Sequence, residues 1–194
     1  PDVIKCNNEV HRDYDLVYLA DFNSPYHGLE ILLRALKDSK LNLIIIGDGK
    51  YLRTIRKEAQ RLKLNNKILF TGRVPFEKLS LYLCRAKIGV VGRPFINNPE
   101  YLYTIPVKTY DYLAAGLPIL GYGPKGSALE EFIHTHSIGM YISKKDPLTM
   151  IYALTDLVNC SDKYRDKARS LALLYDRKRI SLKILDIIVT LFTK

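Results

Sequence analysis

Residues 42–49 read NLIIIGDG: four aliphatic residues in a row, closed by a Gly-Asp-Gly turn. An unbroken aliphatic run of this kind is typical of a parallel strand that is buried on both faces. The segment before it, 27–39, carries apolar residues at helical spacing, and the segment after it, 51–64, has the pattern of a basic helix. The stretch therefore predicts a strand between two helices, the repeating unit of an open parallel sheet.

The same alternation of strand and helix continues along the chain. Strands are predicted at 16–22, 42–47, 67–71, 88–91, 118–122 and 139–142. Helices are predicted at 27–39, 51–64, 77–86, 107–115, 127–136, 146–158, 162–174 and 177–192, with a loop at 92–105. This order predicts an α/β fold, a Rossmann-like open parallel sheet of about six strands with helices on both faces. Ligands of such sheets bind at the carboxyl ends of the strands, in the loops that follow them.

Composition is that of a globular domain, and the charge is uneven. The 194 residues are 47% hydrophobic and 26% charged, with a net charge of +10. No apolar run is long enough to cross a bilayer. Residues 161–194 hold nine Lys or Arg and four Asp or Glu, which is +5 of the total. This basic end is either an exposed helical surface or a surface that attracts an anionic membrane or substrate. No nucleic-acid-binding signature is visible, so no nucleic-acid partner is expected.

The three cysteines, Cys6, Cys84 and Cys160, are far apart and have no CxxC spacing. An odd number of widely spaced cysteines argues against a disulfide framework and against a structural zinc site. The pattern therefore predicts free thiols in a reducing, cytoplasmic compartment.

The strongest candidate site lies in residues 105–118, IPVKTYDYLAAGLP. Lys108 and Asp111 are three residues apart near the start of one predicted helix, so they share a face. The free N–H groups at that helix end attract phosphate, and Arg93 on the preceding loop can bind two phosphate oxygens at once. Asp111 could accept both hydroxyls of a ribose. The alternative is an exposed Lys108–Asp111 ion pair, worth less than about 1 kcal/mol.

Two further motifs leave alternatives open. Gly121, Gly123 and Gly126 spell GxGxxG, but after the fifth strand and with a proline in the turn. The motif is a dinucleotide fingerprint, a loop that faces a phosphate or sugar, or an ordinary tight turn. Asp13 and Asp15 form a DxD before the first strand, at the edge opposite the expected site. They are therefore interpreted as solvated turn residues, and no metal site is predicted.

Several segments, in order, resemble GT-B glycosyltransferases of family 4 in their C-terminal, donor-binding domain. Residues 105–118 resemble the family's PLKxxEYxAxGxPI stretch, and 17–36 (VYLADFNSPYHGLEILLRAL) resemble its first strand and helix. The remaining matches are IIIGDG (44–49), FTGRVP (70–75), VGRP (91–94) and YDRKRISLKILDII (175–188). The resemblance covers residues 17–192 and rests on the order and spacing of the motifs, since each is weak alone.

The resemblance implies a donor site for a UDP- or GDP-type nucleotide-diphosphate sugar, with no cofactor and no metal. Asp111 matches the ribose-binding acid, where Glu is usual, and Lys108 and Arg93 match phosphate-side positions that would stabilise the leaving diphosphate. The other expected donor contacts are Gly47, Gly49, Arg73, Val74, Thr104 and His27. Tyr103 stands where many members carry the first Glu of an E-x7-E pair, and His27 replaces a common Lys.

The resemblance also implies the domain organisation and the activity. Residues 1–15 would be a linker, 16–174 the nucleotide-sugar-binding domain, and 175–194 a helix that crosses toward the protein's own N-terminal acceptor domain. The expected reaction is sugar transfer with retained anomeric configuration, in the cytoplasm or peripherally on the membrane, and the isolated donor half should bind without turnover. The alternatives are an epimerase-type GT-B half and a non-enzymatic nucleotide-binding or membrane-associated module.

Overall fold

A computed structural model of the chain describes residues 4, 6, 10–23 and 28–192. Its centre is a parallel sheet of six strands in the order β3-β2-β1-β4-β5-β6, which confirms the predicted α/β class. The strands are β1 (Tyr14–Leu19), β2 (Leu43–Ile46), β3 (Ile68–Gly72), β4 (Ala86–Gly92), β5 (Ile119–Tyr122) and β6 (Gly139–Ile142).

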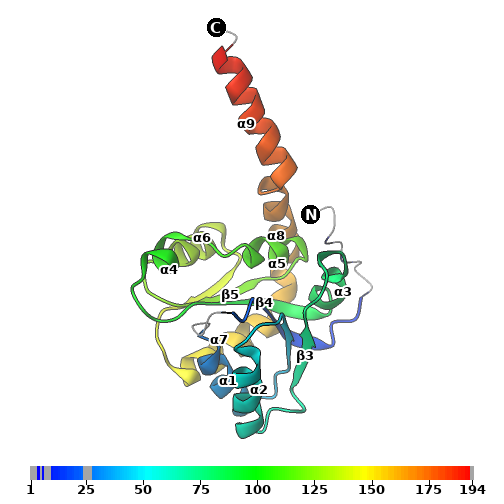
Figure 1. Ribbon diagram of the computed structural model, residues 1–194, viewed down its shortest axis with the longest axis vertical. Coiled ribbons are helices and arrows are strands. Elements are labelled where there is room, and N and C mark those ends of the chain that lie inside the picture. The colour runs from blue at the N-terminus through cyan, green and yellow to red at the C-terminus, as the bar shows by residue number, and fades with distance from the viewer. Residues whose placement is uncertain (1–3, 5, 7–9, 24–27, 193–194) are drawn as a thin grey trace.

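Helices cover both faces of this sheet (Figure 1). One face is covered by α1 (Leu29–Lys37), α2 (Leu52–Arg61) and α7 (Pro147–Asn159). The other is covered by α3 (Ser80–Leu83), α5 (Lys108–Ala114), α6 (Ala128–His136) and α8 (Arg165–Leu174). Two apolar cores result, one on each side of the sheet, which is the three-layer arrangement that the sequence predicted.

The aliphatic run in β2 lies at the centre of both cores. Leu43 and Ile45 point to the core under α1, and Ile44 and Ile46 point to the core under α5. All four are buried, and their neighbours in β1 and β3 are paired with them in parallel register. Burying each such side chain stabilises the fold by about 1.5–3 kcal/mol, which explains why an alternating polar face is absent here.

The main differences from the predicted elements lie in the first strand, in the helix predicted at 77–86 and in the loop predicted at 92–105. The first strand ends at Leu19 and not at residue 22. The helix predicted at 77–86 is divided into a 3-10 turn, η1 (Phe76–Lys78), and the short helix α3. The loop predicted at 92–105 contains a short helix, α4 (Pro99–Tyr103), whose N-cap Asn98 accepts a 2.8 Å hydrogen bond from the Glu100 N–H. An N-cap asparagine followed by proline was the local signal for α4.

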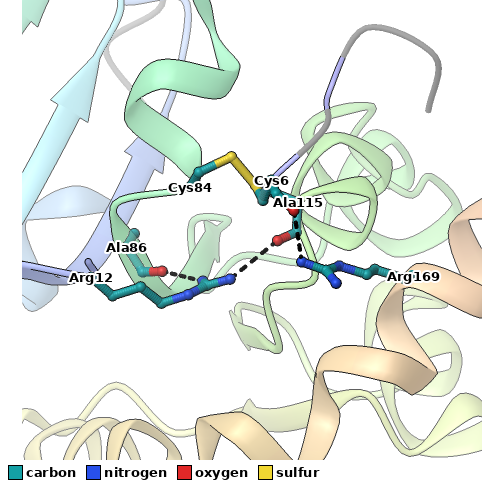
Figure 2. Close-up of a disulfide and its surroundings, with 6 residues drawn as sticks. All are labelled: Cys6, Arg12, Cys84, Ala86, Ala115 and Arg169. Carbon is teal, nitrogen blue, oxygen red and sulfur yellow. Dashed lines mark hydrogen bonds between the residues drawn. A yellow bond between two sulfur atoms is a disulfide. The ribbon is translucent and has the colours of Figure 1, made fainter. Parts of the chain in front are cut away.

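The prediction of free thiols is wrong for two of the three cysteines. Cys6 and Cys84 form a disulfide across 78 residues of sequence, with their Cα atoms 5.3 Å apart (Figure 2). It joins the segment before β1 to the residue that follows α3. Only Cys160 of the described cysteines remains a thiol. Because Cys6 and Cys84 are paired, the cysteine pattern no longer supports a reducing compartment.

Two half-buried arginines lie near this disulfide (Figure 2). Arg12 donates to the carbonyls of Ala86, where β4 begins, and Ala115, just after α5. Arg169 of α8 donates to the Cys6 carbonyl at 3.2 Å (Figure 2). Burial, followed by the nearby Arg165 and Arg169, lowers the pKa of Arg12 to about 10. We call Cys6, Cys84, Arg12 and Arg169 the amino-edge cluster, because it lies where the strands begin.

The last helix, α9 (Arg177–Phe192), projects away from the rest of the domain (Figure 1). No described helix is long and apolar enough to cross a membrane. Its exposed apolar side chains are Ile180, Leu182, Ile184, Leu185, Ile187, Ile188, Val189, Leu191 and Phe192. The helix has the bounds that the sequence predicted, while the domain boundary at 174/175 stays a prediction.

Candidate functional site

The main pocket lies at the carboxyl ends of the central strands, where the topology predicts a ligand site. It has a volume of about 790 Å³ and is formed by the loops after β1, β2 and β3 together with the start of α5. This volume suits a ligand the size of a nucleotide. The lining residues are Leu19, Ala20, Asp21, Asn23, Ile46, Gly47, Asp48, Gly49, Arg73, Val74, Val107, Lys108 and Asp111.

Gly47 and Gly49 line this pocket, as predicted, and their backbone requires glycine. Their φ angles are 134° and 146°, a region that side chains rarely adopt. A Cβ on Gly47 would stand 1.8 Å from the Ala20 carbonyl oxygen, and one on Gly49 would stand 2.4 Å from the Phe22 backbone. The glycines therefore allow the loops after β1 and β2 to touch one another. Their approach to a nucleotide stays a prediction.

Lys108 is the less exposed of the two cations that line the pocket, the other being Arg73. The Lys108 side chain is half-buried, and its ammonium lies 4.8 Å from the centre of the Tyr18 ring. Among the described residues, no carboxylate forms an ion pair with it. Burial, followed by repulsion from Arg93, lowers the pKa of Lys108 from 10.5 to about 7. A half-buried ammonium that has no counter-ion creates a site that favours an anion.

The start of α5 contributes less than the sequence analysis expected. The helix is only seven residues long, and its Thr109 and Tyr110 N–H groups already donate to the carbonyls of Pro106 and Val107. Those N–H groups are not available to a phosphate. The side chain of Lys108, rather than the helix end, is therefore the principal source of positive charge on this wall of the pocket.

Asp111 lies one turn further along α5 than Lys108. It is half-buried and lines the same pocket at the carboxyl edge of the sheet. The alternative of a Lys108–Asp111 ion pair is not found among the described residues. The structure therefore brings the ammonium and the carboxylate to one pocket without pairing them with each other.

Arg93 and Thr104 do not line the pocket. Arg93 follows β4, and its guanidinium contacts Glu100 Oε1 at 3.3 Å and Thr104 Oγ1 at 2.8 Å. It also lies 5.1 Å from the centre of the Tyr101 ring, so α4 and the residue after it hold the side chain. The Arg93 Nε is buried and has no hydrogen-bond partner among the described residues. The expected contact at His27 lies outside the described residues.

Arg73 and Val74 line the pocket after β3, where the sequence analysis expected them. Arg73 is exposed and Val74 is half-buried. Sequence reasoning did not single out Asp21, Asn23 or Asp48, although all three line the pocket. Asp21 accepts hydrogen bonds from the N–H and side-chain amide of Asn23 at 3.1 and 2.6 Å. Their position directly after β1 and β2 was the signal that could have found them.

The two remaining motifs lie away from this pocket. The turn after β5, with Gly123 and Gly126, is absent from its lining. Asp13 and Asp15 lie at the amino edge, as predicted, but they are paired rather than merely solvated: Asp13 with Arg85 and Asp15 with Lys87 at 2.8 Å. Both carboxylates thus act in ion pairs between β1 and β4.

Strand order and pocket position together define a Rossmann-like domain of the kind that forms one half of a GT-B glycosyltransferase. The chain belongs to the family of glycosyl transferases group 1, whose model matches residues 4–172. The pattern of motifs in the sequence predicted this family.

Relatives known by sequence are distant. Alpha-monoglucosyldiacylglycerol synthase of Streptococcus pneumoniae is 26% identical over 87 residues, 45% of this chain and 18% of that protein. Probable glycosyltransferase WbjE of Pseudomonas aeruginosa is 24% identical over 133 residues, 67% of this chain and 32% of that protein. The chain thus spans a third or less of these relatives.

Solved structures share the fold at low sequence identity. Sucrose-phosphate synthase of Thermosynechococcus elongatus superimposes with a TM-score of 0.75 at 19% identity, over 95% of this chain and 47% of that one. HepE of Anabaena, solved in complex with UDP, superimposes with a TM-score of 0.73 at 16% identity, over 92% of this chain and 49% of that one. The chain spans about half the length of these proteins.

Proposed function

We propose that this chain is the donor-binding half of a retaining glycosyltransferase, and that its pocket holds the nucleotide diphosphate of a sugar donor. One observation carries the proposal: Lys108 places an ammonium, which forms no ion pair with any described carboxylate, on the wall of a pocket at the carboxyl edge, with Asp111 one turn away. An anion completes such a site. The family and the UDP complex of HepE support a UDP-type donor.

In this proposal Lys108 contacts the diphosphate and Asp111 accepts hydrogen bonds from the ribose. Negative charge grows on the leaving diphosphate as the bond to the sugar breaks, so a cation fixed beside it stabilises the transition state more than the ground state. Arg93 would add a second cation if it exchanged Glu100 for a phosphate oxygen. Arg73 and Val74 would border the base at the far end of the pocket.

We further propose that the diphosphate is neutralised by side chains and not by a metal ion. The expected result is the same UDP affinity in EDTA and in millimolar Mg²⁺. An affinity that rises by more than about tenfold with Mg²⁺ would contradict this part of the proposal alone.

Binding is tested by a thermal-shift panel of UDP, GDP and their sugars, followed by calorimetry. A ligand that binds only the folded chain raises its melting temperature. Lys108→Met and Asp111→Asn should weaken binding of the best nucleotide without unfolding the chain. The matched controls, Lys145→Met and Asp156→Asn, change exposed residues outside the pocket and should bind as the original chain does. If neither pocket substitution alters nucleotide affinity, the assignment of Lys108 and Asp111 to the donor site is wrong.

We propose that the acceptor binds a second domain of the same protein, and that α9 packs against it. The apolar residues along α9 support this, because an exposed apolar helix surface of this extent usually has a partner. Lys178, Arg179 and Lys183 also favour an anionic membrane. Flotation with vesicles that contain anionic lipid distinguishes packing of α9 against a second domain from binding of α9 to a membrane. A chain that stays with the vesicles would favour the membrane.

A further inference from the structure

A buried aromatic ring contacts the Lys108 ammonium. Tyr18 is on β1 at the centre of the sheet, and it is fully buried. The Lys108 ammonium lies 4.8 Å from the centre of its ring, which is within the range of a cation–π interaction. Burial raises the pKa of the Tyr18 hydroxyl, so the ring faces Lys108 as a neutral phenol.

A second buried tyrosine, Tyr122 on β5, belongs to the same apolar core as Tyr18. The Tyr122 hydroxyl donates to the Gly28 carbonyl at 2.9 Å. Phe95 stacks on the Tyr122 ring with centroids 5.9 Å apart. Because the Tyr18 ring is fully buried in this close-packed core, it cannot turn away from Lys108 without displacing its neighbours.

A ring and a carboxylate would hold a lysine in different ways. A carboxylate partner neutralises the ammonium, and an incoming phosphate has to compete with it. An aromatic face attracts the ammonium through its quadrupole and adds no charge, so the full attraction to an anion is kept. It also contacts only one side of the ammonium, and Lys108 lines the pocket.

We propose that Tyr18 is a positioning residue for the donor: its ring holds the Lys108 ammonium against the pocket wall in the place where a diphosphate meets it. This inference rests on the proposed nucleotide function. It assigns the role to the ring of Tyr18 and not to its hydroxyl.

The test is a double-mutant cycle read by calorimetric UDP titration. Tyr18→Leu removes the ring and should weaken UDP binding by about tenfold. The same change in a Lys108→Met background should weaken it by less than about twofold, because the cation that the ring positions is already gone. Tyr18→Phe keeps the ring and should bind UDP as the original chain does.

A matched control distinguishes positioning from lost packing. Tyr112 is also fully buried, and its hydroxyl accepts a 2.7 Å hydrogen bond from the Leu19 N–H. Tyr112→Leu should therefore lower the melting temperature as Tyr18→Leu does while leaving UDP affinity within about twofold. If Tyr18→Leu fails to fold, Tyr18→Met fills the space without a ring.

Equal weakening by Tyr18→Leu in both backgrounds, or failure of Tyr18→Phe to restore binding, would overturn the inference while the nucleotide site stands. A chain that binds neither UDP nor GDP would instead remove the proposed function itself, and this inference with it.

Discussion

The two edges of the sheet use half-buried cations in opposite ways. At the amino edge, Arg12 and Arg169 donate to backbone carbonyls beside a disulfide, so their hydrogen-bonding groups act within the fold. At the carboxyl edge, Lys108 rests on an aromatic ring and has no ion pair among the described residues. Arg12 and Lys108 are each partly removed from water, and burial lowers the pKa of both.

This difference separates an edge whose cations have hydrogen-bond partners within the fold from an edge whose cation is placed to bind a ligand. The amino-edge cluster joins the segment before β1 to β4, α5 and α8, and its loss should therefore cost stability. The pocket holds an ammonium that forms no ion pair within the described part of the chain, and its loss should therefore cost binding. Changes at the amino edge should therefore lower stability without altering binding, and changes in the pocket should lower binding without altering stability.

The largest effect on stability is expected from the double substitution Cys6→Ser and Cys84→Ser. Cross-links that close a loop of 78 residues restrict the unfolded chain, and their removal should lower the free energy of unfolding by about 4 kcal/mol. Denaturant unfolding measures this loss, and calorimetry should find UDP affinity unchanged. A strong loss of UDP affinity in the folded double variant would mean that the two edges are coupled.

The next largest effect is expected from Lys108→Met, and it should appear in binding. Loss of a hydrogen bond to a charged group corresponds to about 1.5–3 kcal/mol, or about 10–100-fold in UDP affinity. Stability should not fall. The lowered pKa means that the unfolded chain binds more protons between pH 7 and 10.5, so the ammonium opposes folding most fully below pH 7. A marked loss of stability at pH 7 would show that Lys108 has a structural partner.

A smaller effect is expected from pH. Lys108 loses its proton as the pH rises through about 7, and a bound diphosphate favours the charged form. UDP affinity should therefore fall by at most about tenfold per pH unit between pH 7 and 9. Lys108→Arg keeps its charge over this range, so its profile should be flat. Equal slopes for the original chain and this variant would contradict the assignment of the titrating group.

The smallest effect is expected from Asp13→Asn at the amino edge. Asp13 and Arg85 form an ion pair in which both side chains are more than a third exposed, and such pairs contribute less than about 1 kcal/mol. The pKa of Asp13 is lowered, chiefly by its hydrogen bond to Arg85, so the contribution is lost as the pH falls through that lowered pKa. Unfolding at neutral pH should hardly change, and a loss of several kcal/mol would mean that this pair belongs to the amino-edge cluster.

Local patterns predicted most of the carboxyl edge. The Leu43–Ile46 run specifies a doubly buried strand, and the three-residue spacing of Lys108 and Asp111 puts both on one helix face. Gly47 and Gly49 come just after the end of that strand, so their position at the carboxyl edge could also be predicted. These features depend on residues that are close in sequence, so they can be recognised without a structure.

Contacts between distant segments were not predictable in the same way. The Cys6–Cys84 disulfide depends on how the segment before β1 passes α3, which spacing alone does not reveal. The direction of the Arg93 side chain depends on α4, a helix whose Asn-Pro start was read as part of a loop. The contact between Lys108 on α5 and Tyr18 on β1 spans 90 residues of sequence, and no sequence motif indicates it.

The most direct test is a crystal structure of this chain with UDP. The account predicts a phosphate oxygen within about 2.7–3.2 Å of the Lys108 Nζ and the ribose hydroxyls on the Asp111 carboxylate. UDP bound at the amino edge, or in the pocket with its phosphates directed away from Lys108, would contradict it.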